Sequence, residues 1–216
     1  MKIDLTFEKL LLAFFAFIGI LICCRIIYSG SFLFIFLSWN IFLAWTPFWI
    51  SYFLTKRLWN KKWKQWLLFS VWLLFFPNAL YIITDLVHLD IETAVPKWFD
   101  ALLLFASSIV GLMMAFASLY KVEIFLAKKI SKKRMPLVIC AILFLGSFGV
   151  YLGRFLRWNS WDIISNPLGL LSTIIQRFIF PIEHFRAWAV TFVLTAFFYL
   201  LYLTVKKMPG YINRAT

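Results

Sequence analysis

Charged residues, and acidic ones above all, are scarce in this sequence. Only 14% of the 216 residues are charged, and 9 Asp and Glu stand against 22 Lys and Arg. Because about a quarter of the residues of a soluble domain are normally charged, this composition excludes an ordinary soluble domain. The three cysteines, Cys23, Cys24 and Cys140, form no Cys-x-x-Cys pair, so neither a disulfide framework nor a cysteine metal motif is expected.

Familiar catalytic motifs are missing as well. The sequence has no P-loop, no His-Glu-x-x-His zinc motif and no Gly-x-Ser-x-Gly nucleophile elbow. These absences exclude the enzyme classes that depend on those motifs. A function therefore has to be sought in the arrangement of isolated polar residues.

Long apolar runs dominate the chain instead. Hydrophobic residues make up 63% and aromatic residues 21% of the sequence, and the mean hydropathy is +0.89. A helix needs about 20 mostly apolar residues to cross a bilayer. We therefore predict an all-α integral membrane protein with a single transmembrane domain over 1–216, whose six spans are 10–27, 32–54, 66–83, 99–120, 137–153 and 187–205. A seventh stretch, 168–180, is too short to cross, and we expect a re-entrant or interfacial helix there, before the last span.

The distribution of positive charge predicts the orientation. With the N-terminus in the cytoplasm, 16 of the 22 Lys and Arg fall on the inner side, together with three of the nine acids. Lys and Arg concentrate in cytoplasmic loops, so we predict that both termini are cytoplasmic. Contact with anionic lipid explains the basic loops. Membrane lipid is therefore the expected partner, and nucleic acid is not.

Local patterns predict how the spans pack. The turn at 28–31 predicts a tight hairpin between the first two spans. Small residues at a spacing of four let helices approach closely in lipid, and they occur in the fourth and fifth spans, at Ser107, Gly111, Ala115, Gly149 and Gly153. Asp100 lies at the start of the fourth span, where a carboxylate favours the helix dipole.

Polar residues interrupt the outer half of the third span. Pro77 removes a backbone hydrogen bond and bends the helix, and the amide of Asn78 could bond a freed carbonyl. If the helix continues past residue 83, a rotation of about 100° per residue places five polar residues on one face: Asn78, Tyr81, Asp85, His88 and Glu92.

A second polar cluster follows the fifth span, at the same predicted depth on the outer side. It contains Arg154, Arg157, Asn159, Trp161 and Asp162. Ionisable residues at membrane depth usually pair with one another or mark a functional path. The two clusters are therefore expected to meet.

Several chemistries fit this meeting point. In an enzyme, His88 would be a general base oriented by Asp85, and the substrate would be bound by Asn78, Tyr81, Arg154, Arg157, Asn159 and Trp161. Asp85, His88 and Asp162 are also ligand types for a divalent metal, and no other cofactor is indicated. The alternative is an ion-pair network that joins Asp85 and Asp162 to Arg154 and Arg157 and holds the third and fifth spans together.

Two segments carry a resemblance to a known family. Residues 77–89, PNALYIITDLVHL, and residues 153–162, GRFLRWNSWD, resemble the bacterial membrane proteins of the domain of unknown function 1361 family, and the similarity covers nearly the whole chain. The resemblance implies a multi-pass protein of the bacterial plasma membrane, and it implies no activity.

We expect a polar and charged site at the extracytoplasmic membrane face that acts on or binds a lipid headgroup or an envelope precursor. A solute-binding or transport subunit and a structural scaffold or assembly partner are the alternatives.

Overall fold

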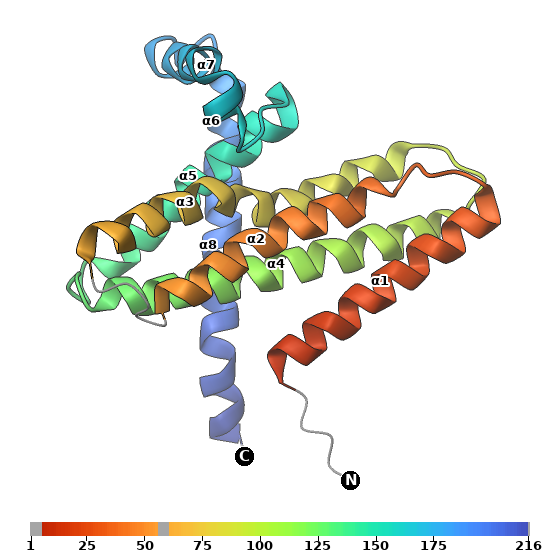
Figure 1. The fold of residues 1–216 in the computed structure, drawn as a ribbon, viewed down its shortest axis with the longest axis horizontal. Helices are drawn as coiled ribbons and strands as arrows, with labels where there is room; N and C mark the ends of the chain where they lie inside the picture. The colour runs from red at the N-terminus through yellow and green to blue at the C-terminus, as the bar shows by residue number, and fades with distance from the viewer. Residues whose placement is uncertain (1–5, 56–60, 216) are drawn as a thin grey trace.

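The computed structural model describes residues 6–55 and 61–215, and the regular structure there is helical (Figure 1). Five of the predicted spans correspond to helices that are long and apolar enough to cross a membrane. These are α1 (Phe7–Ser29), α3 (Lys62–Tyr81) with its 3-10 continuation η1 (Ile82–Asp90), α4 (Lys97–Ala127), α5 (Met135–Leu156) and α8 (Phe185–Ala215). The all-helical class is confirmed.

The span predicted at 32–54 is the least clear of the six. Its helix, α2 (Phe36–Thr55), begins four residues later than predicted and is 20 residues long. It carries Asn40, Thr46 and Pro47 and is not among the helices that are apolar enough to cross. Helix α2 nevertheless packs along both α3 and α4. The count of six spans stays a prediction.

Helix α1 ends where the sequence predicted a turn. Gly30 adopts the left-handed conformation, with φ of 65°, and its N–H bonds the carbonyl of Ile26. This conformation ends a helix at little cost only in glycine. The tight hairpin does not follow, however, because α1 packs mainly against α4 and lies apart from most of α2 (Figure 1).

Helix α4 forms the centre of the molecule, and two thirds of its apolar stretch is buried. A hydrogen-bond relay joins it to two neighbours. The indole Nε1 of Trp72 in α3 donates to Ser118 Oγ at 2.6 Å, and Ser118 donates to the carbonyl of Pro47 in α2 at 3.2 Å. All three groups are buried, so the relay satisfies polar atoms that lipid could not.

The small residues do permit the close packing that their spacing predicts. A Cβ atom at Gly149 in α5 would lie 2.5 Å from Pro77 Cγ in α3. A Cβ atom at Gly111 in α4 would lie 3.0 Å from Ile82 Cδ1. Larger side chains at these glycines would push α5 and α4 away from the α3–η1 segment.

The C-terminal part of the chain has its own packing. Helix α5 packs on α8 through a smaller buried cluster that includes Phe148, Tyr151 and Ala187. Figure 1 shows α8 running steeply across the direction shared by α2 and α4, so the long helices do not form one parallel bundle. Between α5 and α8 lie α6 (Asp162–Ser165) and the short apolar helix α7 (Pro167–Ile179), which matches the helix predicted at 168–180.

Candidate functional site

The polar face of the third span is built differently from the prediction. Pro77 lies inside α3, the α-helix ends at Tyr81, and the chain continues as the 3-10 helix η1 up to Asp90. With three residues per turn, η1 places Asp85 and His88 on one face. Glu92 lies beyond its end, so the five-residue stripe on a continuous α-helix is wrong.

A partly buried ion pair joins η1 to α5. Arg154 Nη2 lies 2.8 Å from Asp85 Oδ1, and Arg154 Nε donates to Thr84 Oγ1 at 2.9 Å. The second carboxylate oxygen of Asp85 accepts from Asn40 Nδ2 at 2.7 Å. The guanidinium of Arg154 also lies 4.8 Å from the centre of the Tyr81 ring. The expected pairing between the third and fifth spans is therefore present at Asp85 and Arg154.

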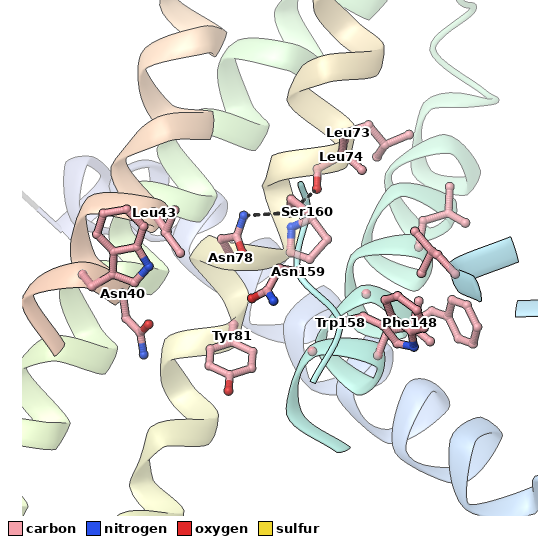
Figure 2. A pocket seen from close by; sticks show the side chains of 17 residues that line it. Asn40, Leu43, Leu73, Leu74, Asn78, Tyr81, Phe148, Trp158, Asn159 and Ser160 are labelled. Atoms are coloured by element: carbon pink, nitrogen blue, oxygen red, sulfur yellow. Dashed lines mark hydrogen bonds between the residues drawn. The ribbon is translucent and has the colours of Figure 1, made fainter. Parts of the chain in front are cut away.

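A pocket of about 290 Å³ lies beside this pair, between α2, α3, α5 and the segment that follows α5 (Figure 2). Among the residues that the structure describes, no Lys, Arg, Asp or Glu lines it. Trp39, Phe148 and Trp158 contribute rings, and the remaining wall is mostly leucine. The polar lining consists of three amides and two hydroxyls, from Asn40, Asn78, Tyr81, Asn159 and Ser160.

Hydrogen bonds across the pocket connect α3 to the segment after α5. Asn78 Nδ2 donates to Ser160 Oγ at 3.0 Å, and Ser160 donates to the carbonyl of Leu74 at 3.0 Å (Figure 2). Proline at position 77 deprives the preceding turn of one donor. That donor would have bonded the carbonyl of Leu73. Ser160 instead bonds the carbonyl of the next residue, Leu74, and the Asn78 amide bonds Ser160 and not a freed carbonyl.

A short turn holds Asn159 and Ser160 at the pocket. Arg157 ends α5 in the left-handed conformation, with φ of 59°. Asp162 then accepts the Asn159 N–H at 2.7 Å and the Ser165 hydroxyl at 2.8 Å. These bonds, the one from Asn159 first, hold the pKa of the Asp162 carboxyl below its usual value because they favour the charged form. Asp162 therefore fixes the turn and is paired with none of the arginines that the structure describes.

The structure brings only some of the predicted site residues together. Asn78, Tyr81 and Asn159 line the pocket, and Arg154 packs over Tyr81. Arg157 and Trp161 are exposed and do not line it. The predicted network of two acids and two arginines thus reduces to the single Asp85–Arg154 pair.

Of the predicted catalytic and metal residues, His88 contacts Asp85 through its backbone carbonyl and not through its carboxylate. The imidazole Nδ1 of His88 lies 2.9 Å from the backbone carbonyl of Asp85, and the ring packs on Phe36 at 4.9 Å. Within residues 6–55 and 61–215, no three His, Cys, Asp or Glu side chains lie close enough to hold a metal. The set of Asp85, His88 and Asp162 therefore forms no metal site in this structure.

Two pocket residues escaped the sequence interpretation. Asn40 comes from α2, which carries no predicted site residue, and Ser160 is not among the residues predicted for the second cluster. A single amide within an apolar run was the available signal for Asn40, since uncompensated polar groups are costly in lipid. The position of Ser160 depends on how α5 meets α3, which no local pattern encodes.

The comparisons with known proteins give a family and no activity. Residues 39–202 match the family described as "Protein of unknown function (DUF1361)". No curated protein and no solved structure matches the chain. The matched region includes α3, η1, α5 and every residue that lines the pocket. The chain belongs to the DUF1361 family.

Proposed function

We propose that the protein binds the uncharged polar headgroup of a membrane amphiphile, such as a lipid or an envelope precursor, in the pocket between α2, α3 and α5. The observation that carries the proposal is the lining itself. Three amides and two hydroxyls surround the space, together with two tryptophans and an aliphatic wall. Binding sites for small amphiphiles combine an apolar wall with a few placed polar groups.

The chemistry of the lining favours hydroxyl and amide groups on the ligand. Side-chain amides donate and accept at once, and so do hydroxyls, so they suit a headgroup that carries several hydroxyls. A phosphate would find no cation in the lining. Arg154, which packs over the lining residue Tyr81, already donates to Asp85 and Thr84.

Binding is better supported than catalysis. Both carboxylate oxygens of Asp85 accept hydrogen bonds from the protein. His88 is oriented by a backbone carbonyl and lies outside the pocket lining. We therefore assign Asp85 a positioning role, in which it holds Asn40 and Arg154 at the edge of the pocket.

The proposal places the pocket at the extracytoplasmic face of a bacterial plasma membrane, with six spans and cytoplasmic termini. The charge distribution supports this orientation. In a chain whose own three cysteines are replaced by serine, Glu92→Cys should react with an impermeant thiol reagent in intact cells, and Ser131→Cys should not. Labelling of the Ser131→Cys chain would contradict the orientation.

Native mass spectrometry of the purified protein tests the binding. With monoglucosyl diacylglycerol as the probe, we expect an adduct on the wild type that weakens about tenfold in Asn78→Leu, the loss of about 1.4 kcal/mol. Tyr81→Phe removes one hydroxyl and keeps the ring beneath Arg154, so it should weaken the adduct less. The control is Gln176→Leu, which changes an exposed amide on α7 outside the pocket.

Equal adducts on the wild type and Asn78→Leu would contradict the proposal. Absence of any adduct on the wild type, with the fold intact by circular dichroism, would also contradict it and would favour the scaffold.

A further inference from the structure

We propose that a second site, a groove between α4 and α8, holds an acyl chain of an anionic phospholipid whose phosphate lies against Lys206. This site is separate from the headgroup pocket and does not depend on it. The groove has a volume of about 790 Å³, and its walls come from the start of α1, the middle of α4 and the end of α8.

The walls are apolar along almost their whole length. The apolar lining includes Leu112 and Phe116 of α4, Leu201 and Val205 of α8, and Phe7 of α1. The polar side chains in the lining are Tyr120, Tyr202 and Lys206, in the second halves of α4 and α8. An acyl chain fits the apolar part of the groove, and a headgroup fits its polar end.

The course of α8 explains why this space exists. Helix α8 crosses α4, and its C-terminal part leads away from α4 (Figure 1). Residues that line the groove are therefore only partly covered by protein, and Met113, Val205 and Met208 are 39%, 47% and 56% exposed. In a bilayer, apolar material has to fill the angle between the two helices. Lipid is the available apolar material.

The polar end carries two lysines, Lys132 and Lys206, and one carboxylate, Glu123, so its net positive charge favours an anionic headgroup. Lys206 Nζ lies 2.5 Å from Glu123 Oε1, and Tyr202 donates to the other oxygen of the same carboxylate. An ammonium group has three donors, so Lys206 retains donors for a phosphate. A second pocket, of about 390 Å³, adjoins this end and is lined by Lys132 as well as Lys206.

The position of the groove agrees with this ligand. Lys206 lies on the side of the chain that holds most of the Lys and Arg, which the charge rule assigns to the cytoplasm. The cytoplasmic leaflet carries anionic lipids, and basic pockets between helices bind their headgroups.

Two matched pairs of variants test the site by native mass spectrometry, with phosphatidylglycerol and phosphatidylcholine as probes. Val205→Trp fills the groove and should reduce the phosphatidylglycerol adduct about tenfold. Val193→Trp, at an exposed position on α8 outside the groove, should leave it unchanged.

The lysine pair tests the selectivity. Lys206→Gln should reduce the preference for phosphatidylglycerol over phosphatidylcholine about fivefold, the effect of one lysine near an anionic surface. Lys207→Gln, its neighbour outside the groove lining, should keep that preference.

Equal lipid adducts on Val205→Trp and Val193→Trp would overturn the proposal. So would a wild type that is dimeric in detergent and becomes monomeric in Val205→Trp without losing lipid, because a second copy would then occupy the groove. Asn78→Leu should leave phosphatidylglycerol binding unchanged, which separates this test from that of the headgroup pocket.

Discussion

Two arginine–aspartate pairs join helices within residues 6–55 and 61–215, and their surroundings differ. Arg25 of α1 binds Asp100 of α4 at 2.8 Å, and the two side chains are 1% and 6% exposed. Arg154 of α5 binds Asp85 of η1 at the same distance, but the arginine is 16% exposed and lies near the headgroup pocket. The first pair is sealed within protein, whereas the second lies at the edge of a cavity.

The sealed pair is bidentate, because Arg25 Nη2 also donates to the second Asp100 oxygen at 3.3 Å. Asp100 accepts a further bond from Thr93 at 2.9 Å, and the Arg25 guanidinium lies 4.3 Å from the centre of the Phe34 ring. The Nη1 atom of Arg25 has no hydrogen-bond partner among the described residues. Because a buried charge that loses its partner is costly, this pair should act as a structural joint. The Asp85–Arg154 pair, which we call the open pair, should instead position the groups around the pocket.

Removing the acid of the sealed pair should give the largest effect on stability. Asp100→Ala leaves the Arg25 charge buried and uncompensated, and we expect a loss of about 3–5 kcal/mol in unfolding free energy. Thermal unfolding in detergent measures the change. The double variant Arg25→Met with Asp100→Leu replaces both charges with apolar groups and should recover most of the stability. Failure of this recovery would show that the charges themselves are needed.

The same substitution in the open pair should cost less. In Asp85→Ala, the Arg154 side chain can turn towards the cavity and be solvated, so we expect a loss of about 1–3 kcal/mol, mainly from unmade hydrogen bonds. Parallel unfolding of Asp85→Ala and Asp100→Ala makes the comparison. A larger loss in Asp85→Ala would reverse the roles that we assign to the two pairs.

A smaller effect on stability is expected at Ser160, which bonds the turn of α3 that precedes Pro77. Ser160→Ala deprives the Leu74 carbonyl and the Asn78 amide of a partner. We expect a loss of about 1 kcal/mol in stability, together with a weaker glycolipid adduct. Ser165→Ala, a serine of the same turn that does not line the pocket, is the control for binding. Equal adducts in the two variants would remove Ser160 from the site.

The smallest effect on stability should come from lowering the pH, which protonates Asp162. The folded-state pKa of Asp162 is depressed, so its stabilisation of the turn is present above the unfolded-state value of about 3.9 and is lost as the pH falls through the lower folded value. Hydrogen exchange of segment 157–166 should therefore accelerate below about pH 4 beyond the change in Asp162→Asn. Identical pH profiles for the two proteins would contradict this role of Asp162.

The comparison of the two pairs also shows what the sequence could predict. The helix at 168–180 and the close packing at Gly111 and Gly149 follow from local patterns, and all three are present. Asp85 and Arg154 could be matched because both lie just beyond the outer ends of predicted spans, at one predicted depth. The contact between them could therefore be predicted without knowing how the helices pack.

The sealed pair was beyond such reasoning. Arg25 and Asp100 are 75 residues apart, and the expected hairpin placed α1 beside α2. Asp100 was assigned to the dipole of α4, whereas the packing of α1 on α4 makes it the partner of a buried arginine. The 3-10 form of η1 and the contact of Asn40 with Asp85 likewise depend on how whole helices meet, and not on the order of residues within them.

The most direct test of the account measures glycolipid binding in two folded variants. Asp85→Asn and Asp100→Asn make the same change in the open and the sealed pair, and native mass spectrometry with monoglucosyl diacylglycerol is done at a temperature where both remain folded. The account predicts that binding falls about tenfold in Asp85→Asn and is unchanged in Asp100→Asn. Equal binding in the two variants would contradict the claim that the Asp85–Arg154 pair positions a headgroup site.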